Sequence, residues 1–280
     1  MELFLNGNYY PASESSISVF DRGFLFGDGI FTTIRVENSV PLFLSHHIKR
    51  LRSSCHFFGI ELVDPDFQGI IAQLLKRNGL RNARVKIIIN RGVDFNNLIY
   101  NYQAKSPTVA VIMYPLDPSP SHPIKLCISK ELRGNEVIYH HKTTSYLQNL
   151  YYKTIARERG FDDCIILNWE KLVCETSTAN LFVIVDQKII TPPQELPLLN
   201  GIMRQLLLSQ GAIGNYLVME DYLTENDLRK IDAAFITSAI LEICPVGGVE
   251  DRVFSVEKPE AIREEWHRIK AAWLQPKKSF

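Results

Sequence analysis

Two stretches in the first third of the chain repeat apolar residues with the period of a surface helix. In the first, apolar side chains recur every three or four positions from Ile48 to Phe58, and Ser45 stands where a helix cap is expected. The second runs from Phe67 to Asn78 and is followed by Gly79, which favours a helix end. Strands are predicted for Leu3–Leu5, with a tight turn at Asn6-Gly7, and for Ile30–Val36, Val85–Ile89 and Thr108–Tyr114.

A proline-rich segment divides the chain. Residues 115–123 contain four prolines and no apolar period, which predicts a stiff, extended linker. We therefore expect a small α+β domain over residues 1–114 and a larger α+β domain over residues 124–280. In the larger domain we expect strands at Ile124–Ser129, Asp163–Leu167, Asn180–Val185, Lys188–Thr191 and Ala233–Thr237, helices at about 144–159, from Gly201 and from about Pro259, and a capping box at Thr224 and Asp227.

The composition is that of an ordinary globular protein, with 46% hydrophobic and 22% charged residues. The formal charge is zero, so no surplus of Lys and Arg favours nucleic acid as a partner. No apolar stretch approaches the roughly 20 residues of a membrane span, and Glu2 and Asn6 stand where a signal peptide would be basic and apolar. The five cysteines form no C-x-x-C pair, which favours reduced, mostly buried thiols and a cytoplasmic protein.

Single motifs carry little information about chemistry. Lys142 precedes two threonines, a serine and Tyr146, and such crowding could orient its amine as a nucleophile toward a carbonyl, although most isolated lysines are surface groups. Glu175 is a carboxylate among hydroxyl side chains just before a predicted strand. Taken alone, this pattern is typical of a capped turn as well as of a functional carboxylate. Gly201 opens a predicted helix and could bind an anion. The adjacent histidines His140 and His141 do not form a metal pair by themselves, so no metal site is expected.

The order of the motifs is more specific than any one of them. Asp-Arg-Gly and Phe-Gly-Asp-Gly at 21–29 are followed by His47-Ile48-Lys49-Arg50-Leu51, Lys142, Glu175 to Asn180, and Gly201-Ile202. This order and spacing resemble the class IV aminotransferases, the fold-type IV pyridoxal-phosphate enzymes, from about Phe4 to Val249. The resemblance implies the two-domain fold of the D-amino acid aminotransferases, pyridoxal 5'-phosphate in the interdomain cleft, a small-molecule amine substrate and a homodimer.

The resemblance also implies roles for individual residues. Lys142 corresponds to the Schiff-base lysine that moves protons, and Glu175 to the carboxylate that keeps the pyridine nitrogen protonated. Arg50 corresponds to the phosphate-binding arginine, a bidentate donor suited to a phosphate dianion. The other residues expected to bind the cofactor are Tyr146 at its phenolic oxygen, Leu199 on its ring face, Ile202 and Met203 through backbone N–H groups at its phosphate, and Asn180, Ser238 and Ala239.

Departures from the family pattern favour one subgroup. Many aminotransferases of this family carry threonine at the positions of Met203 and Ala239. The loss of both threonines resembles the 4-amino-4-deoxychorismate lyases, and a side-chain contact from Ser238 could compensate for the loss at Ala239. The spacing from Lys142 to Tyr146 is one residue shorter than in branched-chain aminotransferases. The Arg-x-His pair of D-amino acid aminotransferases is missing after Arg91-Gly92. We therefore expect a 4-amino-4-deoxychorismate lyase, which makes p-aminobenzoate and pyruvate for folate synthesis. The alternatives are an aminotransferase, branched-chain-like rather than D-amino acid, and a cofactor-binding protein without catalysis.

Overall fold

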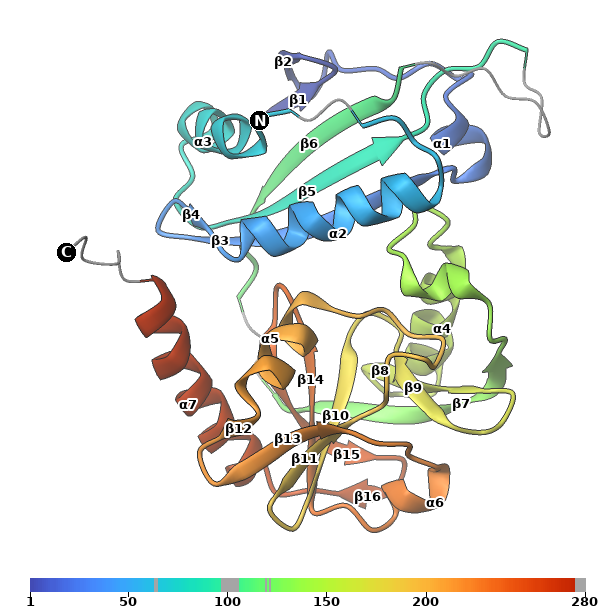
Figure 1. Cartoon of the computed structure of the whole chain (residues 1–280), viewed down its shortest axis with the longest axis vertical. Coiled ribbons are helices and arrows are strands. Elements are labelled where there is room, and N and C mark those ends of the chain that lie inside the picture. The colour runs from blue at the N-terminus through green and yellow to red at the C-terminus, as the bar shows by residue number, and fades with distance from the viewer. Residues whose placement is uncertain (63–64, 97–105, 119, 121, 275–280) are drawn as a thin grey trace. The chain divides into compact units, whose positions relative to one another are not determined.

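The computed structural model describes residues 1–62, 65–96, 106–118, 120 and 122–274 of the chain. These residues form two compact units, each built around its own sheet (Figure 1). The first unit comprises Met1–Pro118 and His141–Leu147, and the second comprises Ser119–His140 and Gln148–Phe280. The chain leaves the first unit at Pro118, within the predicted proline-rich linker.

The first unit contains a six-stranded antiparallel sheet in the order β2-β1-β6-β5-β3-β4. Alternate residues of β5 are buried, as expected for a strand with one face on a core. Two amphipathic helices, α2 and α3, supply the rest of that core through residues such as Leu51 and Leu74. The elements are β1 (Glu2–Leu5), β2 (Asn8–Pro11), α1 (Arg22–Phe26), β3 (Gly29–Glu37), β4 (Val40–Pro41), α2 (Leu44–Phe57), α3 (Phe67–Asn78), β5 (Ala83–Asn90) and β6 (Thr108–Pro115).

The predicted elements of this unit are present, with one correction. The hairpin at Asn6-Gly7 and the helix over Phe67–Asn78 are confirmed. Ser45 does not cap the first amphipathic helix, because α2 starts one residue earlier and its N-cap is Phe43. Phe43 has a left-handed backbone (φ 53°) and no side-chain hydrogen bond to the helix, so packing and not capping sets this helix start.

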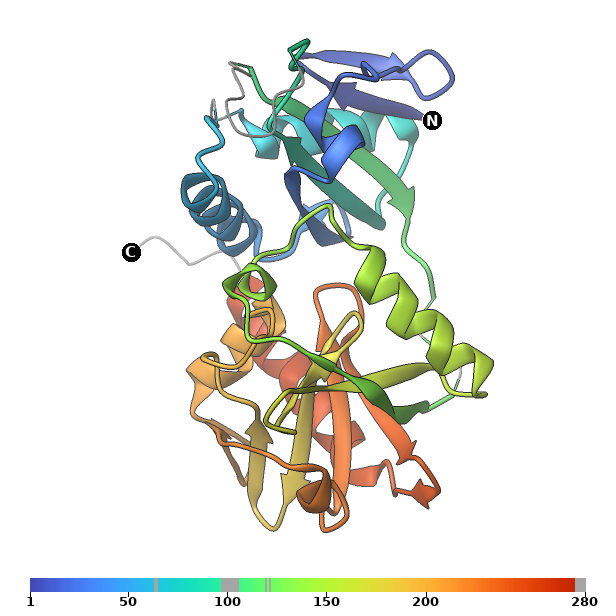
Figure 2. The same ribbon diagram turned by 90° about the vertical axis from the view of Figure 1, so that its right-hand side faces the viewer.

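The second unit is built on a ten-stranded mixed sheet in the order β12-β13-β11-β10-β14-β15-β7-β8-β9, with β16 paired to β15 (Figure 2). Its strands read as apolar runs, and Phe182 and Phe235 stack at 5.0 Å between ring centroids. The elements are β7 (Ile124–Arg133), α4 (Leu147–Glu158), β8 (Asp163–Asn168), β9 (Val173–Thr176), β10 (Asn180–Val185), β11 (Lys188–Thr191), α5 (Ile202–Gln210), β12 (Ala212–Ile213), β13 (Tyr216–Glu220), α6 (Glu225–Leu228), β14 (Ala233–Ser238), β15 (Glu242–Val249), β16 (Arg252–Val253) and α7 (Glu257–Leu274), with a 3-10 turn at Val137–His140.

The helix predicted at about 144–159 starts later in the structure than expected, at Leu147. Residues 141–147 belong to the first unit, where Phe31 N donates to the Lys142 carbonyl at 2.8 Å and Thr144 N donates to the Gly29 carbonyl at 2.8 Å. Because this backbone pairs with the start of β3, it is extended, and α4 begins only at Leu147. The capping box at Thr224 and Asp227 is present as predicted.

Among the described residues, no helix is long and apolar enough to cross a membrane. All five cysteines are free and buried, as predicted.

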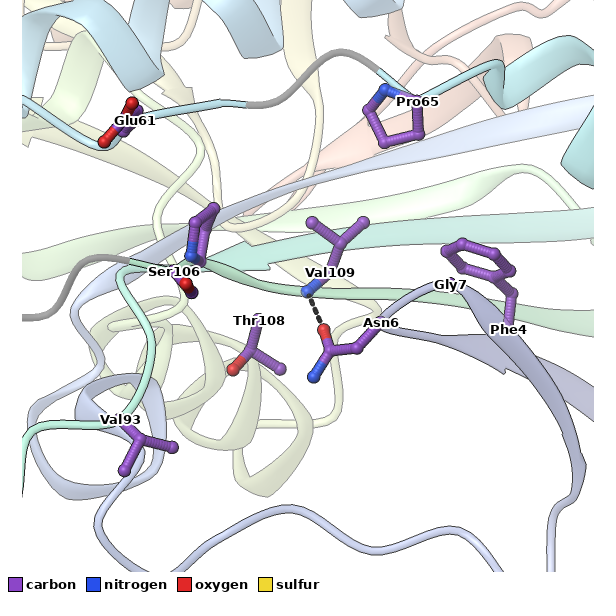
Figure 3. A pocket seen from close by; sticks show the side chains of 10 residues that line it. Phe4, Asn6, Gly7, Glu61, Pro65, Val93, Ser106, Thr108 and Val109 are labelled. Atoms are coloured by element: carbon purple, nitrogen blue, oxygen red, sulfur yellow. Dashed lines mark hydrogen bonds between the residues drawn. The ribbon is translucent and has the colours of Figure 1, made fainter.

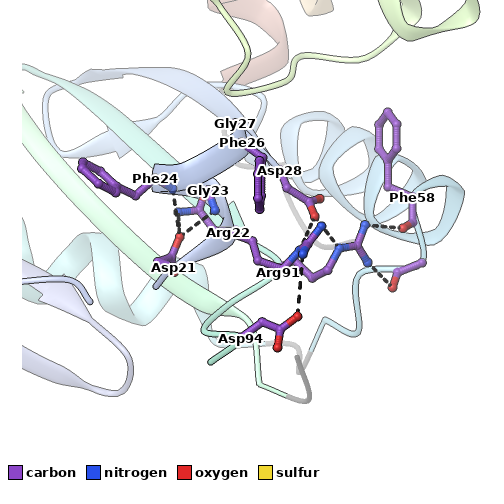
Figure 4. A network of polar contacts seen from close by, with 12 residues as sticks. Asp21, Arg22, Gly23, Phe24, Phe26, Gly27, Asp28, Phe58, Arg91 and Asp94 are labelled. Carbon is purple, nitrogen blue, oxygen red and sulfur yellow. Dashed lines mark hydrogen bonds and ion pairs between the residues drawn. The ribbon is translucent and has the colours of Figure 1, made fainter. Parts of the chain in front are cut away.

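The glycine-rich run at 21–29 is held by a network of buried charges (Figure 4). Asp21 is fully buried, caps α1, and accepts hydrogen bonds from the Asn90 amide at 2.8 Å and the Thr108 hydroxyl at 2.6 Å. Asp28 accepts from Arg22 Nε at 2.9 Å and from Arg91 Nε at 2.8 Å. Burial raises the pKa of Asp28, but the two arginines outweigh burial, so its pKa lies below the ordinary value.

We expect Asp28→Asn to destabilise the first unit by about 3 kcal/mol, since it leaves two buried guanidinium groups without their shared carboxylate. In the wild type, a lowered carboxyl pKa stabilises the fold at neutral pH, and this contribution is lost as the pH falls below 3.8. All three tryptophans lie in the second unit, so native-state hydrogen exchange of β3 and β5 amides is the suitable measurement. Asp117→Asn, at the exposed pair with Arg84, serves as control and should cost under about 1 kcal/mol. Equal losses in both variants would contradict the assignment.

Candidate functional site

Arg50 presents a half-buried cation on the first unit. It extends from α2, and its Nη2 donates to the Thr32 hydroxyl on β3 at 2.9 Å. That hydroxyl lies 2.7 Å from Nδ1 of His47, a fully buried side chain. Burial, with smaller effects from Arg50, His46 and Lys142, lowers the pKa of His47 well below its ordinary value. His47 is therefore neutral, and Thr32 can accept from Arg50 while donating its own proton to His47.

The charge of Arg50 is not neutralised within its unit. Burial lowers its pKa to about 10, and nearby Tyr146 acts in the opposite direction. Among the residues that the structure describes, Arg50 forms no ion pair with a carboxylate. A partly desolvated guanidinium without an acidic partner is suited to binding an anion such as phosphate.

Lys142 and Tyr146 lie on the short segment that pairs with β3. The Lys142 amine is 3.5 Å from the Tyr146 hydroxyl and 4.7 Å from the centre of the Phe31 ring. The Tyr146 ring packs edge-on against Phe31 at 5.3 Å. Backbone pairing to β3 and this aromatic contact set where the amine lies. Arg50, Lys142 and Tyr146, three of the predicted site residues, are thus neighbours on one unit.

Glu175 lies on β9 of the second unit and is 6% exposed. Its Oε1 accepts from Arg133 Nη1 at 2.7 Å, and its Oε2 accepts from Leu199 N at 3.1 Å and from Asn180 Nδ2 at 3.3 Å. The Asn180 amide also donates to the Leu199 carbonyl at 2.7 Å. Three of the predicted residues, Glu175, Asn180 and Leu199, therefore form one hydrogen-bonded cluster.

Arg133, at the end of β7, is missing from the sequence-based list of site residues. It is 1% exposed, donates also to the Pro197 carbonyl at 2.8 Å, and lies 4.6 Å from the centre of the Tyr139 ring. Burial works against its charged form, but Glu175 outweighs burial and the pKa of Arg133 is raised. No motif contains Arg133; the available signal is that a buried carboxylate requires a cationic partner.

The start of α5 brings Ile202 and Met203 to the same region of the second unit. Both side chains are buried, and the N-cap Gly201 supplies no side-chain hydrogen bond to the first turn. A Cβ atom at Gly201 would collide with Oδ1 of Asn180, so a larger residue there would force the Asn180 side chain out of its position. The uncapped N–H groups and the helix dipole make this end a suitable anion site.

Ser238 and Ala239 lie at the hairpin between β14 and β15. Ser238 Oγ accepts from Leu241 N at 3.1 Å across the loop. The preceding Thr237 is opposite Asn180 in the paired strands, and its buried hydroxyl has no hydrogen-bond partner among the described residues. A polar atom buried without a partner indicates a place for a further polar group or water.

Other features of the described residues do not add a second site. No group of three or more His, Cys, Asp or Glu side chains is placed to hold a metal ion there. A cavity of about 680 Å³ in the first unit is lined by residues such as Phe4, Asn6 and Thr108, none of which was predicted to carry chemistry (Figure 3). The sequence makes loops such as the polar one at Gly92–Ser106 candidates for setting substrate specificity, and part of that loop lies outside the described residues.

The chain resembles characterised proteins over nearly its full length. It is 30% identical to the aminodeoxychorismate lyase of Bacillus subtilis, over 92% of this chain and 90% of that protein. It is 29% identical to a Methanocaldococcus jannaschii protein assigned to the branched-chain-amino-acid aminotransferases, over 98% of each. A solved Legionella pneumophila structure, assigned as a 4-amino-4-deoxychorismate lyase, superposes with a TM-score of 0.86 at 28% identity, covering 93% of this chain and 96% of that one.

The fold agrees with the same group of enzymes. The branched-chain aminotransferase of Escherichia coli superposes with a TM-score of 0.88, covering all of this chain and 97% of that one, at 21% identity. The family model for class IV amino-transferases matches residues 29–249, a range that contains all ten predicted site positions. Together with the two-sheet fold, this match identifies the chain as a member of the class IV aminotransferase family, whose enzymes depend on pyridoxal phosphate.

Proposed function

We propose that this enzyme is a 4-amino-4-deoxychorismate lyase, which converts its substrate to p-aminobenzoate and pyruvate for folate synthesis. The observation that carries the proposal is the residue pattern at the phosphate-binding positions, with Met203 and Ala239 where aminotransferases carry threonine. The similarity to the Bacillus subtilis lyase and to the Legionella structure supports the same assignment.

Each unit by itself carries groups of the kind that pyridoxal 5'-phosphate needs. The phosphate, a dianion, requires cationic and N–H donors; the first unit offers Arg50, and the second offers the uncapped start of α5. The pyridine nitrogen requires an anionic acceptor, and Glu175 is a buried carboxylate. The unpartnered hydroxyl of Thr237, next to Asn180, adds a donor at the same face of the sheet. We assign Arg50, Tyr146, Asn180, Leu199, Ile202, Met203, Ser238 and Ala239 to binding the cofactor, together with Lys142 and Glu175.

Pyridoxal phosphate supplies an electron sink for the pair of electrons released at the amine-bearing carbon. The Lys142 amine takes the proton from that carbon, and its neighbour Tyr146 holds the amine in place. The substrate then loses its three-carbon side chain through cleavage of a C–O bond, and the abstracted proton returns to that side chain as it leaves as pyruvate. The ring becomes aromatic, which makes the elimination favourable.

Arg133 keeps Glu175 in the form that this chemistry needs. A buried carboxylate alone would tend to take up a proton and become neutral. The guanidinium at 2.7 Å, with the Leu199 and Asn180 N–H groups, stabilises the negative charge instead. Glu175 therefore stays an acceptor for a hydrogen bond from a protonated ring nitrogen.

An aminotransferase is the alternative, and the similarity to the Methanocaldococcus jannaschii protein favours the branched-chain type. The D-amino acid type is less well supported, because the Arg-x-His pair of that type is missing after Arg91-Gly92. A cofactor-binding protein without catalysis is the third possibility. The five free, buried thiols support a reducing compartment, and we propose the cytoplasm.

The Lys142→Ala variant should lose the near-visible absorbance band of the bound cofactor and release pyruvate at least about a thousandfold more slowly. The measurement is an absorbance spectrum of purified protein with added pyridoxal phosphate, followed by a pyruvate assay. Lys86→Ala is a matched control, because the Lys86 amine lies 4.4 Å from the centre of the same Phe31 ring. A band that persists in Lys142→Ala, or disappears equally in Lys86→Ala, would refute the role of Lys142.

The wild-type enzyme should release pyruvate from aminodeoxychorismate, while L- and D-amino acids leave the cofactor in its aldehyde-derived form. A panel of amino acids, scored by absorbance for pyridoxamine phosphate, checks this. Conversion by a branched-chain L-amino acid without pyruvate release would establish the aminotransferase instead. A cofactor band that no substrate changes would favour the protein without catalysis.

We also propose a homodimer, as the family resemblance implies. Light scattering on a size-exclusion column should then give twice the chain mass of 32.1 kDa. A mass equal to that of one chain at micromolar concentration would contradict the proposal.

A further inference from the structure

The hairpin tip that carries Ser238 and Ala239 is closed by a residue in an unusual backbone conformation. β14 ends at Ser238, β15 begins at Glu242, and these two residues are paired across the loop. Glu242 has a φ of 56°, in the left-handed region that glycine adopts more easily than any other residue. A glutamate at such a position needs contacts from its side chain to hold it there.

The carboxylate of Glu242 makes those contacts with the C-terminal helix. It is 4% exposed and accepts from Lys270 Nζ at 2.8 Å and from Trp266 Nε1 at 3.2 Å. Lys270 and Trp266 lie one turn apart on α7, and both are buried. The helix packs along β14 and β15 through the same face. The hairpin conformation is therefore tied to α7 by a buried ion pair and a neutral hydrogen bond.

We propose that α7 holds this hairpin tip in the conformation that binds the cofactor phosphate, with Lys270 and Glu242 as positioning residues. The inference rests on the proposed function, which assigns Ser238 and Ala239 to the phosphate. Because Met203 and Ala239 provide no hydroxyl, these two positions can contact the phosphate only through backbone N–H groups. Backbone donors bind well only when the loop that carries them is held in one conformation. The ion pair supplies that constraint from a helix which does not itself contribute a predicted cofactor ligand.

Lys270→Met should weaken the binding of pyridoxal phosphate to the full-length protein by about tenfold, as is typical when a supporting contact of a binding loop is removed. The affinity is measured by absorbance titration of the cofactor-free protein. Lys270→Arg, which keeps a cation at this position, should restore most of the affinity. Lys258→Met is the matched control, because Lys258 lies on the same helix and pairs with Asp232 in an exposed ion pair. It should change the affinity less than about twofold.

A second pair of measurements separates positioning from general stability. Pyridoxal lacks the phosphate, so Lys270→Met should weaken pyridoxal binding much less than pyridoxal phosphate binding. Glu242→Gly relaxes the backbone while removing the ion pair, and it should show the same selective loss even where its unfolding temperature is unchanged. Equal losses for the two ligands, or an unchanged affinity in both variants, would overturn this inference alone. A wild-type protein that binds no pyridoxal phosphate would instead overturn the proposed function, and this inference with it.

Discussion

The position of the Lys142 amine depends on backbone hydrogen bonds between two segments that are more than one hundred residues apart. The Lys142 carbonyl accepts from Phe31 N, and Thr144 N donates to the Gly29 carbonyl. Gly29 in turn follows Asp28, which two buried arginines hold in place. Since every residue except proline keeps its backbone N–H, these two hydrogen bonds do not depend on the identity of the side chains at Phe31 and Thr144, proline excepted. The Lys142 amine is thus placed by the main chain of β3 and lies beside the rings of Phe31 and Tyr146.

Charge burial is used differently in the two units. In the first, Arg50 forms no ion pair with a carboxylate among the described residues. In the second, Glu175 and Arg133 are both buried and already paired. An unpaired charge favours binding of an opposite charge, whereas a buried pair stabilises the charged forms of both its members. This difference agrees with the roles proposed above, phosphate binding for Arg50 and acceptance of a ring N–H hydrogen bond for Glu175.

Much of the fold follows from local patterns, and the exceptions have a physical cause. The periods of α3, β5 and β14, the turn at Asn6-Gly7 and the capping box of α6 are local signals, and each predicts the observed element. The late start of α4 results from pairing of Thr144 with Gly29, which no local pattern encodes. The ten proposed site positions follow from the resemblance to the class IV aminotransferases, whereas Arg133 lies outside every motif and is identified only by its contact with Glu175. Sequence motifs identify groups of given chemistry, but their charge partners are set by tertiary packing.

Because residues 141–147 belong to the first unit, the protein cannot be divided into its two units at one point of the chain. The chain passes between the units at 118–119, at 140–141 and at 147–148, so the first unit is not one contiguous segment. A gene fragment encoding residues 1–118 would contain the entire six-stranded sheet and yet lack its lysine. No single cut in the gene therefore separates the two units intact, because a seven-residue segment of the first unit lies between two stretches of the second.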